Sequence, residues 1–232
     1  MIREDFELSE QIIGLVPGTG KQSKGIALRL GKAGYNVLIG SRNEEKAVST
    51  AKELNEQIGK DYCKGFSNEE IVKRSDIIFL VVPPEYLEST LQKLNPFFKE
   101  DAIIVDVNVP LKFEEGICYF LESDNYKSAS EHIQAIVPKH VSVIGAFKTI
   151  SAAKLNNLNR PLDVDVFLTS DYQETINTIQ EILSKIDGLR VLNAGPLMFS
   201  RTTEQMTALV ININKLNKLK HASFKVMTTH KK

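Results

Sequence analysis

The chain alternates short apolar runs with longer amphipathic stretches, and this alternation limits its possible folds more than any other feature. Apolar runs of strand length occur at residues 12–16, 36–39, 76–82, 102–105 and 141–146. Between them, residues 21–33, 44–58 and 85–94 have the composition and spacing of helices. Strands this apolar need helices on both faces of their sheet, which is typical of parallel α/β folds. The pattern therefore predicts an α/β protein with a Rossmann-type, doubly wound and mainly parallel sheet.

The alternation of apolar and amphipathic segments becomes less regular after about residue 160. Strands are expected at residues 165–168 and 189–192, and helices at residues 172–186 and 202–219. We expect a sheet domain over residues 8–155 and a smaller C-terminal α/β extension over residues 156–232. The last helix carries an apolar stripe that predicts either core or a dimer interface, formed by Met206, Leu209, Val210, Ile213 and Leu216.

Composition excludes several classes of protein. The 232 residues carry 29 basic and 29 acidic side chains, so a general nucleic-acid binder is not expected. No apolar run approaches the roughly 18 residues that a membrane span needs, so no membrane partner is expected. The only cysteines, Cys63 and Cys118, do not suggest a disulfide framework or, with the scattered histidines, a metal site. A cytoplasmic protein is the expectation.

A glycine-rich segment follows the first predicted strand. It reads Gly18-Thr19-Gly20-Lys21-Gln22-Ser23 and approximates the dinucleotide fingerprint G-x-G-x-x-G. The first glycine permits a sharp turn, the second lets the backbone approach a pyrophosphate, and the helix N-terminus offers N–H groups to phosphates. A purely structural turn is the alternative, but the strand before it and the helix after it favour nucleotide binding.

The end of the second strand indicates which nucleotide binds. An NAD site usually places an acid there, whereas an NADP site offers cations and hydroxyls to the 2′-phosphate. This chain has Ser41 and Arg42, with Lys46 one helical turn further on, and its first acids are already in the helix. We therefore expect NADP(H), with a solvated helix start and a Glu–Lys surface pair as the alternative.

The other predicted nucleotide contacts come from later strand ends, because ligands of parallel sheets bind outside the carboxyl ends of the strands. Val82 and Pro83 follow the strand at residues 76–82, Val109 follows the strand at residues 102–105, and Ala146 ends the strand at residues 141–146. We expect these residues to frame the nicotinamide. The prolines at 83 and 110 are equally consistent with simply stopping strands.

The sequence resembles the F420-dependent NADP oxidoreductase family over nearly its whole length. The resemblance implies an NADP-binding Rossmann fold, a small C-terminal part that closes over an acceptor cleft, and a homodimer. It also implies hydride transfer between NADP(H) and a small-molecule redox acceptor, the deazaflavin coenzyme F420. The stretches that carry it are Gly18–Gly20, Lys24–Leu30, Ile39–Arg42, Glu45–Ala47, Thr149–Ile150, Ala152–Ala153, Ile186–Arg190, Ala194–Leu197 and Ser200–Arg201.

Departures from the family pattern gather on the acceptor side. The family has glycines where this chain has Pro17 and Ser23, and Pro-Trp-Glu-His where it has Pro83–Tyr86. An apolar stretch of the family is replaced by residues 106–110, which begin with an aspartate. Most important, Lys148 stands where the family has a histidine beside the deazaflavin.

Lys148 is the candidate catalytic residue, and three interpretations of it stay open. It could hydrogen-bond an anionic deazaflavin, donate a proton to a carbonyl or imine acceptor, or be an ordinary solvated lysine. The function predicted first is therefore an NADPH:F420 oxidoreductase. The alternatives are an NADPH-dependent reductase of a flavin or small carbonyl or imine compound, and a non-catalytic NADP(H)-binding protein.

The net charge of zero conceals an uneven distribution. No acid follows Glu204, whereas six lysines do: Lys215, Lys218, Lys220, Lys225, Lys231 and Lys232. One interpretation is a helix C-terminus that favours cations, followed by a solvated tail. The other is a basic rim that attracts a polyanionic cofactor such as F420.

Overall fold

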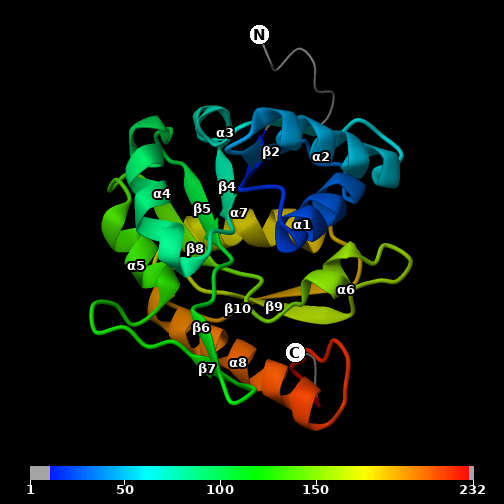
Figure 1. Cartoon of the computed structure of the whole chain (residues 1–232), viewed down its shortest axis with the longest axis vertical. Helices are drawn as coiled ribbons and strands as arrows, with labels where there is room; N and C mark the ends of the chain where they lie inside the picture. Colours follow the sequence, from blue (N-terminus) through cyan, green and yellow to red (C-terminus); the bar gives the residue numbers. More distant parts are fainter. Residues whose placement is uncertain (1–10, 230–232) are drawn as a thin grey trace.

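A six-stranded parallel sheet forms the centre of the computed structural model, which describes residues 11–229 (Figure 1). The strand order is β3-β2-β1-β4-β5-β8, and every neighbouring pair is parallel. The order reverses direction between β1 and β4, which is the switch point at which such sheets bind ligands. The predicted Rossmann-type fold is confirmed. The strands are β1 (Ile13–Val16), β2 (Val37–Ser41), β3 (Cys63–Ser67), β4 (Ile77–Leu80), β5 (Ile103–Asp106) and β8 (Ser142–Gly145).

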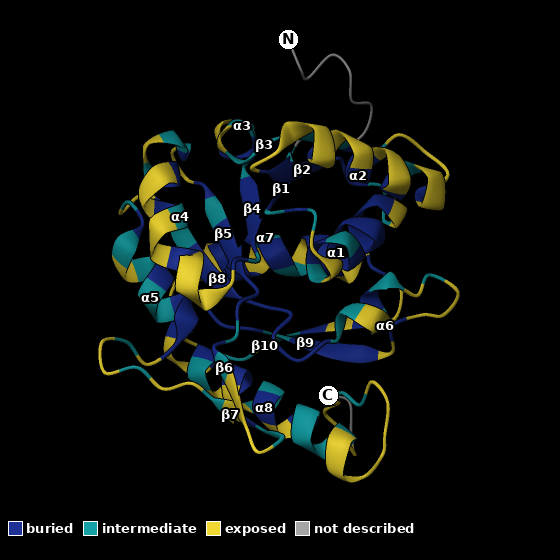
Figure 2. Cartoon of the chain, in the orientation of Figure 1, coloured by how far each residue is buried: buried dark blue, intermediate teal, exposed yellow. Residues whose placement is uncertain are grey.

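Helices cover both faces of this sheet, because successive strand residues point to opposite sides. On β1, Leu15 joins one apolar cluster and Val16 the other. Figure 2 shows the resulting buried strands between half-exposed helices. The first cluster includes side chains of α1 (Lys21–Lys32), α2 (Glu44–Ile58) and α7 (Gln173–Ser184), and the second those of α3 (Asn68–Arg74), α4 (Leu87–Leu94) and α5 (Ala129–Ile136). Single 3-10 turns are η2 (Pro84–Tyr86), η3 (Asn95–Phe97) and η4 (Leu197–Phe199).

The C-terminal part adds a second, two-stranded parallel sheet made of β9 (Val164–Leu168) and β10 (Leu189–Asn193). An antiparallel bridge between Gly145 and Thr169 links it to the end of β8. Its residues Val164 and Val166 are in the same apolar cluster as the centre of the main sheet. The small C-terminal extension is thus present and shares a core with the rest, while the domain boundary near residue 155 stays a prediction. Two further helices are α6 (Ala152–Asn156) and α8 (Ser200–Leu216).

A β-hairpin that the sequence pattern did not indicate leaves the main sheet after β5. It consists of β6 (Leu111–Glu114) and β7 (Ile117–Phe120), which pair antiparallel. Asn212 of α8 binds the backbone of Cys118 in both directions, each at 2.8 Å. The hairpin therefore connects the main sheet to the last helix, beside which it lies in Figure 1.

The predicted apolar stripe on α8 divides between core and surface. Val210 is buried, but the side chains of Leu209 and Leu216 are 52% and 67% exposed. The helix buries a more polar face instead, with Thr203 and Glu204 turned inward. Leu209 and Leu216 do not belong to the core of the single chain.

Candidate functional site

The carboxyl ends of the parallel strands bring the predicted nucleotide residues to one edge of the sheet. Backbone hydrogen bonds join neighbouring strand ends: Gly18 N–H donates to Gly40 O at 2.7 Å, and Val107 N–H donates to Leu80 O at 3.2 Å. The loops after β1, β2, β4, β5 and β8 therefore form one continuous rim. This arrangement is the one that the sequence predicted from strand periodicity and motif position.

The residues predicted to frame the nicotinamide differ in how far their side chains are exposed. Pro83 is exposed and Val109 is half-buried, so both can contact a ligand directly. Val82 and Ala146 are buried in the two apolar clusters. Their side chains support the rim from beneath and leave only backbone atoms for a ligand.

The glycine loop has one crowded and one open position. A Cβ at Gly18 would lie 2.7 Å from Ile39 Cγ2 and 3.0 Å from the Gly40 nitrogen, so a side chain cannot fit there. A Cβ at Gly20 would meet only Ser23 Oγ, at 3.9 Å. Gly18 is thus required by the fold itself, whereas the space beside Gly20 is left free for a ligand to approach the backbone.

The rest of the loop is fixed to the protein. Ser23, at the position of the third glycine, is buried and donates its hydroxyl hydrogen to Pro17 O at 2.6 Å. Gln22 donates its amide to Ile150 O at 3.1 Å, which ties the loop to the segment after β8. Thr19 is half-buried and Lys21 is exposed at the first turn of α1. Gln22 therefore positions the loop in this structure, while Thr19 and Lys21 remain open to a phosphate.

The end of β2 presents two cations to solvent. Arg42 and Lys46 are both exposed, and within residues 11–229 neither side chain forms an ion pair or hydrogen bond. Asn43 caps α2 by accepting from the Lys46 N–H at 2.9 Å, and Ser41 Oγ accepts from the Asn43 N–H at 3.1 Å. The Ser41 hydroxyl hydrogen therefore stays free, beside two uncommitted cations. This set suits the 2′-phosphate of NADP. Within residues 11–229 Lys46 pairs with neither Glu44 nor Glu45, although the exposure of these residues is equally consistent with a solvated start of α2.

Lys148 lies in the interior, in what we call the buried charge cluster: Asp106, Lys148 and Glu204. Its side chain is 1% exposed, and those of both acids are 0% exposed. The ammonium donates to Asp106 Oδ2 at 2.5 Å and to Glu204 Oε1 at 3.1 Å. A third hydrogen bond, of 2.6 Å, goes to Asn108 O. Burial lowers the pKa of Lys148, but the two carboxylates outweigh burial and raise it above its ordinary value.

These contacts correct the expectation for Lys148. The solvated interpretation is wrong, because the side chain is enclosed and ion-paired. All three ammonium hydrogens are committed to protein oxygens, so none is available to an acceptor in this arrangement. Asp106 and Glu204 were not foreseen as its partners, because β5, the loop after β8 and α8 meet only in three dimensions.

The described part of the C-terminal tail, up to residue 229, contacts the C-terminal sheet and the start of α6. Its Val226 N–H donates to Asp165 Oδ2 at 2.6 Å, and Lys225 pairs with Asp163. His221 Nδ1 lies 3.4 Å from the hydroxyl oxygen of Ser151, at the start of α6. Residues 221–226 therefore contact the protein, although His221, Lys225 and Val226 are also exposed to solvent, while Lys231 and Lys232 lie outside the described residues.

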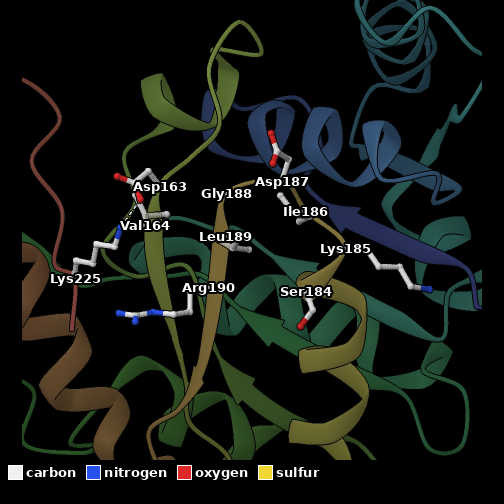
Figure 3. Close-up of a pocket in the computed structure, with 10 residues that line it drawn as sticks. All are labelled: Asp163, Val164, Ser184, Lys185, Ile186, Asp187, Gly188, Leu189, Arg190 and Lys225. Carbon is white, nitrogen blue, oxygen red and sulfur yellow. Dashed lines mark hydrogen bonds and ion pairs between the residues drawn. The ribbon is translucent and has the colours of Figure 1, made fainter. Parts of the chain in front are cut away.

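A pocket of about 630 Å³ lies at the starts of β9 and β10 and the end of α7 (Figure 3). Its walls are charged, and several of the charges are ion-paired: Lys225 pairs with Asp163, and Arg190 pairs with Asp165, which does not line the pocket. None of the predicted nucleotide residues lines it. The pocket therefore belongs to the C-terminal sheet and not to the nucleotide rim.

The described part of the chain contains neither a candidate metal-binding cluster nor a helix that could span a membrane. Between residues 11 and 229 no cluster of three His, Cys, Asp or Glu side chains could hold a metal ion. Over the same residues, every helix is too short or too polar to cross a bilayer. Cys63 and Cys118 are both buried free thiols.

Known proteins resemble this chain in sequence and in fold. Residues 12–110 match the model of a family described as "NADP oxidoreductase coenzyme F420-dependent". The F420-dependent NADP reductase of Methanothermobacter marburgensis is 32% identical over 92% of this chain and 97% of its own length. That of Methanocaldococcus jannaschii is 32% identical over 87% of this chain and 92% of its own. A crystal structure from Arthrobacter sp. FB24, assigned as a candidate F420-dependent NADP reductase, shares the fold with a TM-score of 0.77, 18% identity, and coverage of 95% of this chain and 100% of its own.

Proposed function

The chain belongs to the F420-dependent NADP oxidoreductase family, and on that premise we propose that it transfers hydride between NADP(H) and coenzyme F420. The observation that carries the nucleotide half is the pair of exposed, unpaired cations Arg42 and Lys46 beside the open position at Gly20. The acceptor half rests on the relatives of 32% identity, whose names describe them as F420-dependent NADP reductases.

The proposed NADP site runs along the rim from the end of β2 to the end of β5. The 2′-phosphate binds Arg42, Lys46 and the free Ser41 hydroxyl, because these are the donors left without protein partners. The pyrophosphate lies over Gly20, where the first N–H groups of α1 point outward. This course leads the nicotinamide to Pro83 and Val109, beyond the switch point between β1 and β4.

The protein contributes orientation more than acid–base chemistry. When both are bound, NADPH supplies a hydride and the deazaflavin accepts it, which requires the two rings to stack at close range. Pro83 and Val109 offer one ring an apolar surface on the rim. Gln22, through its hydrogen bond to Ile150 O, holds the segment after β8 against the glycine loop. The hydrogen bond keeps the two segments that border the site in a fixed relative position. The apolar surface excludes water from one face of the nicotinamide.

A different acceptor is favoured by one specific observation. By the resemblance described above, Lys148 stands where the family has a histidine, and its ammonium is turned into the buried charge cluster. The acceptor side therefore lacks that imidazole, and a flavin or a small carbonyl or imine compound is the second candidate substrate. A non-catalytic NADP(H)-binding protein has no observation of its own to favour it.

The test is to mix the purified protein with NADPH and F420 and follow the absorbance of both cofactors. Stoichiometric loss of both bands, reversed by excess NADP, is the expected result. Oxidation of NADPH with flavin or with a carbonyl or imine compound, but not with F420, would move the function to the second candidate. Binding of NADPH without oxidation by any of them would contradict an enzymatic role.

We also propose that the protein is a homodimer through the exposed apolar side chains of α8 and the hairpin. Leu209, Leu216 and Phe113 are 52%, 67% and 65% exposed, and Leu209 and Leu216 lie two turns apart on α8. A second copy burying these side chains is the expected occupant. Light scattering should give twice the chain mass of 26.0 kDa, and Leu209→Lys with Leu216→Lys should reduce it to one chain. A wild-type protein that is monomeric at high micromolar concentration contradicts the dimer.

A further inference from the structure

The buried charge cluster joins three parts of the protein that are far apart in the sequence. Asp106 is the last residue of β5, Lys148 follows the end of β8, and Glu204 lies in α8. Glu204 also accepts from the Ala129 N–H of α5 at 3.1 Å, and Asp106 accepts from the Ser130 hydroxyl at 2.6 Å. The cluster is therefore a junction between the main sheet and the last helix.

On the side of the sheet, the cluster fixes the backbone that leads to the nicotinamide rim. Asp106 Oδ1 accepts from both the backbone N–H and the side-chain amide of Asn108, at 2.9 and 2.8 Å. Lys148 donates to the carbonyl oxygen of the same Asn108 at 2.6 Å. The next residue is Val109, which is half-buried on the rim. The position of Val109 is thus set by charges beneath it.

On the side of the helix, Lys148 is held at two points. Its ammonium bonds Glu204, and its carbonyl oxygen accepts from the Thr207 hydroxyl at 2.7 Å. Glu204 and Thr207 lie one turn apart on α8 and face the same segment. Lys148 therefore connects the Asn108–Val109 backbone directly to α8, through its ammonium and through its carbonyl oxygen.

We infer that Lys148 is a positioning residue for hydride transfer, which holds the nicotinamide-facing segment 106–109 and helix α8 at one fixed separation through Asp106 and Glu204. The inference rests on the proposed function, because it needs the nicotinamide at Val109 and the acceptor on the side of α8. Removing the ammonium leaves two buried carboxylates without their shared cation, so the two elements move apart or admit water. A displacement of about 1 Å between reacting groups costs about 100-fold in rate.

The experiment compares Lys148→Met, Lys148→Arg and Glu204→Gln in the full-length protein. Lys148→Met is expected to lower the rate of hydride transfer at least tenfold and to raise the deuterium isotope effect with NADPH labelled at C4. The dissociation constant of 2′,5′-ADP should stay within about twofold, because the adenosine end binds at Arg42, away from the cluster. Arginine should restore part of the rate, since it keeps the cation.

Glu204→Gln provides a second test of the inference in case the Lys148→Met protein does not fold. It preserves shape and leaves the Lys148–Asp106 pair, so a smaller loss of rate with a raised isotope effect is expected. Arg190→Met is the matched control, because it breaks the ion pair with the buried Asp165 in the C-terminal sheet without touching residues 106–109. It should reduce stability and leave the isotope effect unchanged.

A second readout separates failure of this inference from failure of the proposed function. The fluorescence of bound NADPH reports the surroundings of the nicotinamide without any acceptor. If the wild type turns over no acceptor, the proposed function fails, but a changed emission in Lys148→Met with unchanged 2′,5′-ADP affinity still supports the positioning role. The positioning role is overturned if Lys148→Met and Glu204→Gln show the same isotope effect and the same NADPH emission as Arg190→Met.

Discussion

The Nε–H of Arg29 on α1 donates to the carbonyl oxygen of Leu155 on α6 at 3.0 Å. Other N–H groups of the same buried guanidinium reach the carbonyl oxygens of Lys154, Asn157 and Arg160. These acceptors are at the end of α6 and in the loop after it, where a helix leaves its last carbonyls unpaired. Arg29 therefore fastens α6 and the loop after it to α1, the helix that begins at the glycine loop.

Arg29→Met is expected to lower the free energy of unfolding by about 2–4 kcal/mol, because it leaves several buried carbonyls without a donor. Arg29→Lys should recover only part of this, since one ammonium cannot span the same acceptors. Urea denaturation measures both. Lys24→Met, which removes an exposed ion pair with Glu53, is the control and should cost less than about 1 kcal/mol. Equal losses of unfolding free energy for Arg29→Met and Lys24→Met would show that the Arg29 hydrogen bonds do not stabilise the fold.

The two loop glycines should separate folding from nucleotide binding. Gly20→Ala should leave urea unfolding unchanged, because its Cβ has open space and its φ of −78° suits alanine. NADPH affinity should nevertheless fall at least tenfold, since the methyl group occupies the room proposed for the pyrophosphate. Gly18→Ala should instead cost about 1–3 kcal/mol of stability through overlap with Ile39 and Gly40. Unchanged NADPH binding by Gly20→Ala would mean that the nucleotide takes another course.

Arg42→Ala should weaken NADPH binding by roughly 10- to 100-fold, the value of one charged hydrogen bond of about 1.5–3 kcal/mol. NADH binding should hardly change, because NADH lacks the 2′-phosphate. Fluorescence titration with each nucleotide gives the ratio. Lys52→Ala, another exposed lysine further along α2, is the control and should alter neither affinity. A parallel loss for NADPH and NADH would remove Arg42 from the 2′-phosphate site.

Asp165 should make stability depend on acidity. Burial raises the pKa of its carboxyl, but hydrogen bonds from Arg190 at 2.7 and 2.6 Å and from the Val226 N–H outweigh burial and bring the pKa below the ordinary 3.8. A carboxyl with a depressed pKa stabilises the fold above its unfolded-state pKa, and this contribution is lost as the pH falls toward its folded-state pKa.

Asp165→Asn should therefore cost about 1.5–3 kcal/mol near neutral pH, as expected for hydrogen bonds to a charged group. The difference between wild type and variant should shrink as the pH is lowered below about 4. Urea unfolding at a series of pH values measures it. A difference that is constant, or that grows toward acid, would show that the charge of Asp165 does not stabilise the fold.

The parts of the fold that could be predicted are those in which burial repeats with a regular period. Five strands of the main sheet are apolar because helices cover them on both faces, and the sequence shows each one. The edge strand β3 was not recognised, because four of its five residues are only half-buried and the selection for apolar side chains is weak. The hairpin escaped for the same reason: three residues of β6 are exposed.

The candidate site also has one part that could be predicted from the sequence and one part that could not. The nucleotide loop and Arg42 lie next to their strands in the sequence, so local pattern was sufficient to find them. The buried charge cluster spans residues 106 to 204, and nothing local marks Glu204 as the partner of Lys148. Long-range ion pairs depend on how the elements pack, which a periodicity does not encode.

The tail contact at Asp165 has a consequence for how the protein is made. Strands β1 to β3 are complete once residue 67 has been synthesised, so the start of the nucleotide half can assemble early. Asp165, in contrast, obtains one of its partners from Val226, close to the end of the chain. The C-terminal sheet can therefore reach its final form only after residue 226 has left the ribosome, and a nascent chain stalled before that residue would hold strands β1 to β3 beside an unfinished C-terminal sheet.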